Sequence, residues 1–359
     1  MPTIGEIFQA YGPSYLEAFG DKIPRGHRKA IKDLASCRTG ELGWHVYECP
    51  DCGEVHYVNH SCRNRSCPLC HARQREDWLA ARSGELLPVP YFHVIFTVPE
   101  ELRRPVRSNS ATLLDVLMTA AGRTLLKFGQ DSRFIGGKTG VVMVLHTWTG
   151  AMEYHPHVHC VVPAGGIDGF LWRSSREGFL FPVTAMSKVF RGMFLDLARA
   201  ADPGLEIPAG ALEKDWVVYA KPAPDKVDSL IRYLGRYVHR VAISNSRILA
   251  IEDGKVSFLW KDSRDSRKKV MVLPVFEFMR RYLQHVLPSG FHKVRYFGFM
   301  SPSNRKVFRR IKLLLWLRSG SAFPAKEPPR PGFICRACGK GLLTMISACF
   351  PGSRAPPRS

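Results

Sequence analysis

The sequence predicts an α+β protein, in which a zinc-bound N-terminal domain precedes an antiparallel sheet backed by helices. Six of the ten cysteines lie within the first 70 residues, and four of them form two Cys-x-x-Cys pairs, a spacing typical of zinc sites. After residue 88 the chain carries short apolar runs bounded by Pro and Gly, which indicate strands, and two of these runs flank a turn-like segment typical of a hairpin. Segments with helical periodicity lie between and after the strands.

Residues 1–88 are expected to form a helical and zinc-binding domain. Arginines interspersed among its cysteines, such as Arg38, Arg63 and Arg65, can contact phosphates, so this domain is expected to bind DNA. Apolar side chains from Ile4 to Phe19 keep helical spacing, with a predicted break at Gly12-Pro13. Residues 37–71 are rich in Cys, His, Asn and Gly and lack a periodic apolar pattern, so a metal is expected to organise them. A helix is predicted from about residue 72 to residue 87, ended by two prolines.

Residues 89–262 are expected to form a catalytic domain built on the antiparallel sheet. Strands are predicted over residues 91–98, 141–148, 157–163, 216–220, 248–251 and 256–260, and helices over residues 110–128, 184–200 and 225–242. The Thr149-Gly150 segment is predicted to join the second and third strands as a hairpin, and Glu-Asp-Gly-Lys is a second hairpin signal between the last two strands.

Residues 263–323 are expected to form a basic helical region, with helices over 274–286 and 303–318. The second helix carries Arg309 and Arg310 among six basic side chains and no acidic one, so it is either a phosphate-contacting face or a solvated charged face. Residues 324–359 are rich in Pro, Gly and Arg and contain one more Cys-x-x-Cys, which predicts a partly disordered tail.

The charge of the chain indicates a polyanionic partner. Lys and Arg number 52 against 31 Asp and Glu, a formal net charge of +21, so nucleic acid is the expected partner. With 45% hydrophobic residues the chain has enough apolar material for a core, which excludes wholesale disorder. No apolar run approaches the ~20 residues that span a bilayer, and no signal-peptide layout is present. We therefore expect no membrane partner and a cytoplasmic location, on the nucleoid when bound to DNA.

Two knuckles, Cys49-x-x-Cys52 and Cys67-x-x-Cys70, are predicted to hold one structural zinc ion between them. Each knuckle presents two thiolates on one side of a turn, and two knuckles fill all four positions of a tetrahedron. Cys37, Cys62 and several histidines lie nearby, and they either supply a second zinc site or are small buried residues. A disulfide framework is disfavoured because no secretion signal is present.

The run His157-Val158-His159 is the candidate catalytic metal site. Residues of a strand alternate faces, so the two imidazoles point the same way with the valine behind them. Two imidazoles can hold a divalent ion and leave positions open for a phosphate or water, which suits catalysis. His146 on the preceding strand is the candidate third ligand, with Glu153 and His155 as alternatives. Ordinary structural histidines are the competing interpretation.

The predicted helix after residue 225 carries Tyr233 and Tyr237, which are four residues apart and therefore neighbours on one face. One interpretation is an ordinary core stripe, because apolar residues accompany the tyrosines at helical spacing. A stripe of basic residues beside the tyrosines favours a second interpretation, in which a tyrosine phenol attacks a DNA phosphate that a metal or cation activates. This stripe contains Arg232, Arg236 and Arg240.

Together these motifs resemble the HUH-type rolling-circle insertion-sequence transposases with two tyrosines, the insertion sequence ninety-one family. The resemblance covers most of the chain and rests on CRTGELGWHVYECPDCG with SCRNRSCPLC, on LHTWTGAMEYHPHVHCVVPAGG, on YLGRYVHRVAISNSRI and on FHKVRYFGF. It implies an HUH-type sheet flanked by helices, a catalytic metal pair at His157 and His159, and nucleophiles at Tyr233 and Tyr237. It also implies zinc ligands at Cys37, Cys49, Cys52, Cys62, Cys67 and Cys70. Family members often have His before the second knuckle, where this chain has Ser66.

The expected function is bacterial DNA transposition by a rolling-circle-like route. A tyrosine attacks single-stranded DNA at an insertion-sequence end and forms a 5′-phosphotyrosine, while Mg²⁺ or Mn²⁺ on the histidines polarises the phosphate. The second tyrosine accepts the other strand. Two alternatives remain open: an HUH replication initiator or relaxase-type nuclease, and a non-catalytic zinc-dependent nucleic-acid-binding protein.

Overall fold

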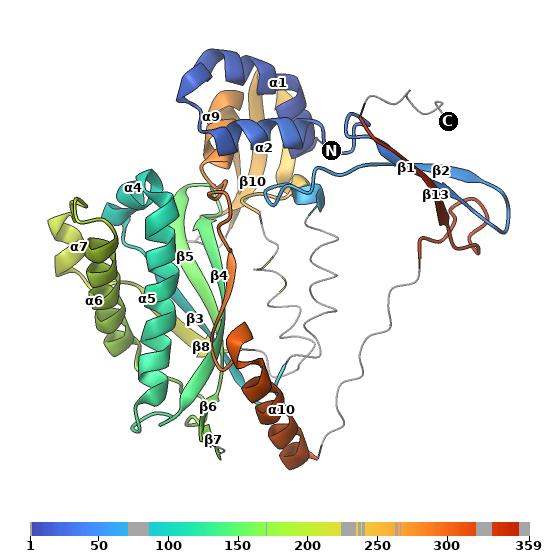
Figure 1. Cartoon of the computed structure of the whole chain (residues 1–359). Coiled ribbons are helices and arrows are strands. Elements are labelled where there is room, and N and C mark those ends of the chain that lie inside the picture. The colour runs from blue at the N-terminus through green and yellow to red at the C-terminus, as the bar shows by residue number, and fades with distance from the viewer. Residues whose placement is uncertain are drawn as a thin grey trace. The chain divides into compact units, whose positions relative to one another are not determined.

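The chain forms two compact units, and neither is continuous in sequence. The computed structural model describes residues 2–70, 86–169, 171–223, 235, 238, 241–262, 265, 267–320 and 332–351. Unit 1 contains residues 1–74, 243–286 and 327–359, and unit 2 contains residues 75–242 and 287–326. Figure 1 labels the elements, and each unit is treated by itself below.

This division differs from the predicted boundaries after residues 88, 262 and 323. Residues 243–262, expected in the catalytic domain, belong to unit 1, and residues 287–323, expected in a separate C-terminal region, belong to unit 2. Part of the expected tail, β13 (Thr344–Cys349), is a strand of unit 1. The compact units differ from the predicted segments because strand pairing joins parts far apart in the chain, and the pattern within one segment carries no information about its partner.

Unit 2 is built on a seven-stranded sheet with β4 and β5 near its centre. Its strands are β3 (Tyr91–Thr97), β4 (Lys138–Trp148), β5 (Tyr154–Pro163), β6 (Gly165–Asp168), β7 (Leu171–Ser174), β8 (Val218–Pro222) and β12 (Val294–Gly298). The order is β7-β6-β4-β5-β3-β8, with β12 also paired to β4, and these pairings are antiparallel. The predicted antiparallel sheet and the β4–β5 hairpin are confirmed, whereas β6, β7 and β12 were not predicted.

Helices cover one face of this sheet (Figure 1). They are α4 (Glu100–Ser108), α5 (Ser110–Gln130), α6 (Val183–Ala201) and α7 (Ala209–Glu213). The sequence of α5 repeats buried residues at Leu113, Leu117 and Leu125, which form one apolar face. This face packs in one core with Phe96 of β3 and Val158 of β5. Strand side chains alternate, so the histidines on either side of Val158 lie on the opposite face of the sheet.

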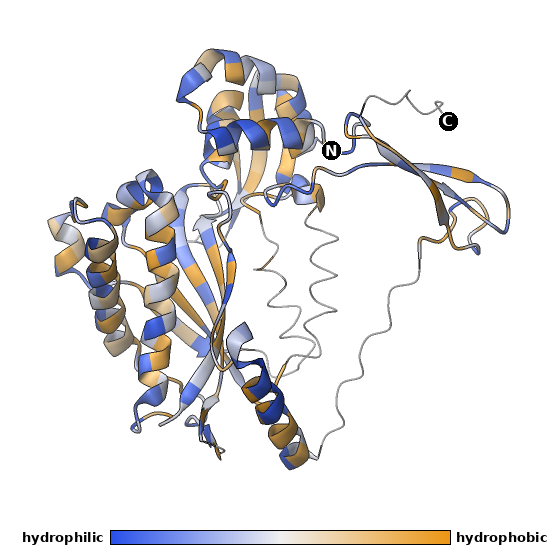
Figure 2. Cartoon of the chain, viewed as in Figure 1, coloured by the Kyte–Doolittle hydropathy of each residue, from blue (hydrophilic) through white to orange (hydrophobic). Residues whose placement is uncertain are grey.

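That opposite face is partly covered by α10 (Arg305–Ser319), which confirms the helix predicted over residues 303–318. Ile311 and Leu315 of α10 pack in one cluster with Tyr91 of β3 and Val161 of β5. Val161 follows His159 by two residues and therefore shares its face. Figure 2 shows hydrophilic residues gathered toward the N-terminal end of α10 and hydrophobic residues after them. Among the described residues, no helix combines the length and apolar character needed to cross a bilayer.

Unit 1 contains a helical part with its own small sheet. Its elements are α1 (Ile4–Phe19), α2 (Arg25–Ala35), β9 (Ile248–Glu252), β10 (Lys255–Lys261), β11 (Lys268–Pro274) and α9 (Val275–Leu283). A capping box begins α1, in which the Thr3 hydroxyl accepts from the Glu6 N–H and the Glu6 carboxylate accepts from the Thr3 N–H. The predicted break at Gly12-Pro13 is wrong, since Pro13 lies inside α1. Gly12 lies so close to Ile31 of α2 that a Cβ on Gly12 would come within 3.0 Å of the Ile31 side chain. Packing of α1 against α2 at this point stabilises the helical conformation on both sides of Pro13.

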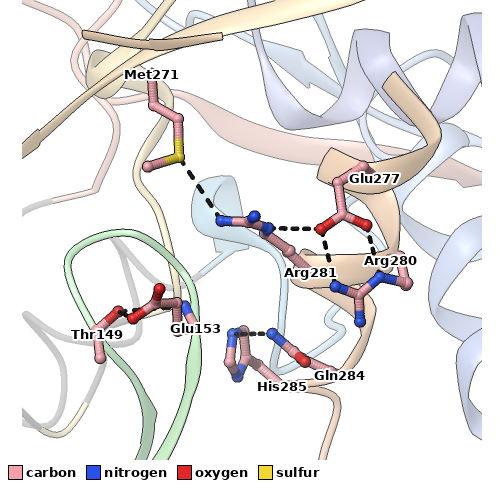
Figure 3. A network of polar contacts seen from close by, with 8 residues as sticks. All are labelled: Thr149, Glu153, Met271, Glu277, Arg280, Arg281, Gln284 and His285. Carbon is pink, nitrogen blue, oxygen red and sulfur yellow. Dashed lines mark hydrogen bonds and ion pairs between the residues drawn. The ribbon is translucent and has the colours of Figure 1, made fainter. Parts of the chain in front are cut away.

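The two basic residues of α9 pair with one carboxylate of the same helix (Figure 3). Glu277 accepts hydrogen bonds from Arg280 at 2.6 Å and from Arg281 at 2.7 Å. The Arg280 guanidinium holds the pKa of Glu277 at about 2, so this carboxylate is ionised at neutral pH. Glu277 therefore offsets part of the positive charge of α9, whereas α10 contains no acidic residue.

A second sheet of unit 1 joins the two ends of the chain. Its strands are β1 (Trp44–Glu48), β2 (Val55–Asn59) and β13, in the order β13-β1-β2. Both pairings are antiparallel, with Trp44 opposite Cys349 and Glu48 opposite Thr344. We call this sheet, together with the Cys49-x-x-Cys52 and Cys335-x-x-Cys338 knuckles, the ribbon.

Candidate functional site

Three histidines from two neighbouring strands lie together on the face of the unit 2 sheet opposite α4–α7. His146 comes from β4, and His157 and His159 come from β5. One ring nitrogen of each lies within 4.8 Å of the others. His146 and His159 are buried, and His157 is half-buried. We call these residues the histidine group.

The β4–β5 hairpin determines this arrangement. Its register places His146 directly opposite His157, so the two side chains share one face. In the turn, the Thr149 N–H donates to the Glu153 carbonyl at 3.1 Å, and the Thr149 hydroxyl accepts from the Glu153 N–H at 3.2 Å. A register shift of one residue would move His146 to the other face, because the side-chain period of a strand is two.

Hydrogen bonds orient the two β5 rings. His157 Nδ1 lies 2.7 Å from the His155 carbonyl oxygen, and because a carbonyl only accepts, Nδ1 carries the hydrogen. In a neutral His157 the lone pair is then on Nε2, which is the nitrogen that can ligate a metal. His159 Nδ1 lies 2.9 Å from Nε2 of the buried His93 on β3. Such a partner on the second ring nitrogen is typical of metal-binding histidines.

The histidine group fits a divalent cation. Neutral imidazole is a common transition-metal ligand, and three protein ligands leave coordination positions open for a substrate oxygen. Burial lowers the pKa of His93 to about 4, so His93 is neutral at pH 7 and can accept the His159 N–H. The donor set and the outer hydrogen bond are therefore compatible with a bound divalent cation.

Of the three candidate third ligands, the structure brings only His146 into the group. Glu153 lies in the hairpin turn, where its carboxylate accepts from the Thr149 hydroxyl at 3.5 Å (Figure 3). The His155 ring lies beside that of His157, with centroids 5.3 Å apart, but it is outside the group. Burial lowers the pKa of His155 to about 4.

Replacing His93 should weaken metal binding without removing a ligand. In His93→Phe, His159 loses its hydrogen-bond partner, and changes of this kind typically reduce metal affinity by ~10–100-fold. The Kd for Mn²⁺ can be measured by electron paramagnetic resonance, with His155→Phe as the matched control because that ring is outside the group. Equal Mn²⁺ affinities for wild type and His93→Phe would show that His93 does not orient a ligand.

Eight cysteines of unit 1 form two groups of four. The first group is Cys37, Cys62, Cys67 and Cys70, and the second is Cys49, Cys52, Cys335 and Cys338. Neighbouring sulfurs lie 3.6 to 3.8 Å apart in the first group and 3.8 Å apart in the second. Four sulfurs at ~2.3 Å from a tetrahedral zinc ion would be about 3.8 Å apart, so both groups have zinc-site dimensions. None of these cysteines is in a disulfide.

The prediction that the two N-terminal knuckles share one ion is wrong. Cys49 and Cys52 lie between β1 and β2, at the tip of this hairpin, whereas the other four N-terminal cysteines lie at its base. Five-residue strands separate tip and base by about 17 Å, which is too far for one ion. The knuckle at the tip is completed by Cys335 and Cys338, which were assigned to the tail and not predicted as ligands.

The sequence does contain a signal for this pairing. Both knuckles of the second group are followed directly by a glycine, at Gly53 and Gly339, and these glycines have φ values of +72° and +70°. In each knuckle the carbonyl of the first cysteine accepts from that glycine N–H, at 2.8 and 2.9 Å. The Cys67 knuckle is followed by His71 instead. The motif Cys-x-x-Cys-Gly thus identifies the two matching knuckles.

The predicted tyrosine helix lies mostly outside the described residues. Tyr233, Tyr237, Arg232, Arg236 and Arg240 are all outside them. Gly235 and Val238, the two described residues among these positions, are helical and buried. On α10, Arg309 and Arg310 are both exposed.

Comparison with known proteins gives two family models and two relatives. The model described as "Transposase zinc-binding domain" matches residues 7–98, and the model described as "Putative transposase" matches residues 140–307. The chain is 37% identical to "Putative transposase y4qJ" of Sinorhizobium fredii, over 99% of this chain and 98% of that protein. It is 26% identical to "Transposase for insertion sequence element IS801" of Pseudomonas savastanoi pv. phaseolicola, over 88% of this chain and 82% of that protein. No solved structure matches the chain.

Proposed function

The chain belongs to the insertion sequence ninety-one family of transposases, and we propose that it cleaves and rejoins single-stranded DNA through a 5′-phosphotyrosine intermediate. It is a DNA-processing protein with a zinc-binding N-terminal domain. The observation that carries the proposal is the histidine group, in which three potential metal ligands lie on one face of a rigid antiparallel sheet. The reaction would move an insertion sequence by a rolling-circle-like route.

In the proposed reaction the phenol oxygen of Tyr233 or Tyr237 attacks the scissile phosphorus. The bond from phosphorus to the 3′ oxygen breaks, the phenol loses its proton, and the departing 3′ oxygen gains one. The free energy of the broken ester is kept in the phosphotyrosine, so attack by a 3′-hydroxyl can rejoin DNA without nucleotide hydrolysis. Two tyrosines four residues apart would be neighbours on one face of the predicted helix, which would allow one to hold the first strand while the other accepts the second.

The histidine group would hold the divalent ion, which supplies Lewis-acid polarisation of a phosphate oxygen. The protein contributes orientation: the His155 carbonyl and His93 direct the β5 rings through their second nitrogens. An imidazole-only ligand set suits Mn²⁺ better than Mg²⁺, which prefers oxygen ligands. We therefore expect cleavage to be faster with Mn²⁺ than with Mg²⁺.

A gel assay with single-stranded oligonucleotides tests the proposal. The full-length protein is incubated with labelled strands that carry the DNA flanking its own gene, with Mn²⁺ or Mg²⁺, and the products are separated under denaturing conditions. The proposal expects a downstream fragment linked to the protein through its 5′ phosphate, an upstream fragment with a free 3′-hydroxyl and, with a second strand, a joined product. Metal-dependent nicking without any covalent protein–DNA species would overturn it.

Basic residues of α10 should contribute to DNA binding. They lie on a helix that packs against the histidine-bearing face, and Arg309 and Arg310 are exposed. Arg309→Glu with Arg310→Glu should weaken single-stranded DNA binding and reduce the salt dependence of log K by about 1.4, since each lost phosphate contact lowers the slope by ~0.7. Fluorescence anisotropy at several salt concentrations measures this slope.

The matched control for this charge reversal is Arg123→Glu with Lys127→Glu. These exposed residues lie on α5, which covers the other face of the sheet, and the change in net charge is the same. An equal loss of slope in both double variants would mean that net charge alone is responsible, and α10 would then be a solvated face.

A further inference from the structure

The second cysteine group draws its ligands from opposite ends of the chain. We propose that Cys49, Cys52, Cys335 and Cys338 hold a zinc ion of their own, which fastens the C-terminal segment 332–351 onto the β1–β2 hairpin. The matched zinc-binding family model covers residues 7–98 and so contains only half of these ligands. The proposal concerns the architecture of the ribbon and is independent of the cleavage chemistry.

The environment of the sulfurs is that of a metal site. Cys49 and Cys335 are fully buried. The sulfur of Cys49 lies 3.8 Å from that of Cys338, and the sulfur of Cys52 lies 3.8 Å from that of Cys335. His56 Nε2 lies 3.2 Å from the Cys335 sulfur, a distance at which its ring N–H donates to a thiolate. Such outer hydrogen bonds stabilise ligands that carry negative charge.

The backbone around the group also fits two knuckles closed on one centre. Both knuckles have the same turn, with a left-handed glycine directly after the second cysteine. Gly341 passes so close to the opposing knuckle that a Cβ there would lie 2.3 Å from the Cys49 sulfur. Glycine at this position therefore allows the approach of the two knuckles, and any side chain would occupy the space of a ligand.

The rest of the ribbon buries too little apolar surface to hold the C-terminal segment. No residue of β2 or β13 is buried, and Met345 and Ile346 are each 54% exposed. Ring contacts join the segment to the hairpin at Tyr47–Phe333 and His60–Phe350, with centroids 5.8 Å apart in both pairs. Small domains with so little core usually need disulfides, a metal or oligomerisation, and the cysteines of the ribbon form no disulfide. Where a metal supplies the stability, its binding is coupled to folding.

The two cysteine groups should therefore depend on different parts of the chain. All ligands of the first group lie within residues 37–70, whereas the second group needs Cys338. A chain that lacks residues 332–359 should retain the first ion, lose the second and leave the thiols of Cys49 and Cys52 without a metal and reactive. The second site thus makes the N-terminal hairpin dependent on the presence of the other end of the chain.

Cysteine labelling combined with zinc analysis tests the assignment. Native full-length protein is treated with an alkylating reagent, labelled positions are read by mass spectrometry, and bound zinc is measured. For Cys335→Ser with Cys338→Ser we expect one equivalent of zinc fewer than in wild type, labelling of Cys49 and Cys52, and continued protection of the first group. The matched control is Cys349→Ser on β13, outside both groups, which should change neither zinc content nor protection.

Two results would overturn the proposal. One is unchanged zinc content in the Cys335→Ser, Cys338→Ser variant with Cys49 and Cys52 still protected. The other is exposure of Cys67 and Cys70 in the same variant, as expected if the N-terminal knuckles shared an ion. If the variant does not fold, wild-type protein treated with increasing chelator gives the answer: Cys49, Cys52, Cys335 and Cys338 should become reactive together, as a set separate from the first group. Joint reactivity of Cys49 and Cys52 with Cys67 and Cys70 would contradict the assignment.

Discussion

Changing both Tyr233 and Tyr237 to Phe is expected to eliminate the covalent protein–DNA adduct and leave the protein folded. The substitution removes only the two hydroxyls. If these are core groups, each loss should lower the free energy of unfolding by about 1 kcal/mol, because one hydrogen bond is lost. As nucleophiles they are the atoms that bond to phosphorus, so their removal should reduce adduct formation to background. The measurement is a denaturing gel of labelled single-stranded DNA, with circular dichroism to verify the fold.

The control for this experiment is Tyr219→Phe. Tyr219 lies on β8, and the register through Ile95 places it on the same face of the sheet as His159. It is 49% exposed, so losing its hydroxyl should not disturb the core or the adduct. The single variants at 233 and 237 should each stop full transposition, while one of them retains cleavage. A protein-linked band that persists in the double Phe variant would place the nucleophile elsewhere in the chain.

The second large effect is expected from His157→Ala with His159→Ala. Both imidazoles of β5 are then lost, and with them the polarisation of the phosphate, which is worth several kcal/mol, or about a thousandfold in rate. DNA affinity and its salt dependence should stay close to wild type, because they arise from Lys and Arg contacts to many phosphates. Cleavage is measured with Mn²⁺, and binding by anisotropy under the same conditions.

His159 is buried and its loss leaves a cavity, so a second variant separates catalysis from folding. His157 is half-buried, and His157→Ala alone should retain the thermal stability of the wild type while losing most of the cleavage activity. His155→Ala, which lies outside the histidine group, is the matched control and should cleave normally. Undiminished nicking by the double variant would mean that the catalytic ion binds at another site.

The sheet and its histidines were predictable because their signals are local. The apolar runs that predicted β3, β4 and β5 are bounded by turn residues, and the period of two places His157 and His159 on one face. The short Thr149-Gly150 turn also brings His146 opposite His157 through the hairpin register. By contrast, β12 reaches β4 from more than a hundred residues away, and nothing in its own pattern identifies this partner.

The helices α5, α6, α9 and α10 lie close to their predicted ranges, whereas α4 and α7 were not predicted. The helix predicted over residues 72–87 lies mostly outside the described residues. In α1, tertiary packing outweighed a local preference. Gly12-Pro13 indicates a break, but the contact of Gly12 with Ile31 of α2 keeps α1 continuous. The mixed helix and antiparallel-sheet class did not depend on this detail. The role of the tyrosine pair stays a prediction, since both residues lie outside the described part of the chain.

By itself the sequence determined the family, the α+β class and the presence of zinc-binding cysteines, and it singled out His157 and His159 of β5 as the candidate metal pair. The motif Cys-x-x-Cys-Gly marks two knuckles as alike, but only the tertiary structure shows that these two lie together. Composition and spacing identify a knuckle, but its partner depends on which distant segment of the chain folds back next to it. Here the rigid β1–β2 hairpin separates the N-terminal knuckles by its own length, and β13 brings Cys335 and Cys338 to the tip. The physical reason is that a metal site depends on distances in space of a few ångströms, while sequence spacing limits those distances only for neighbouring residues.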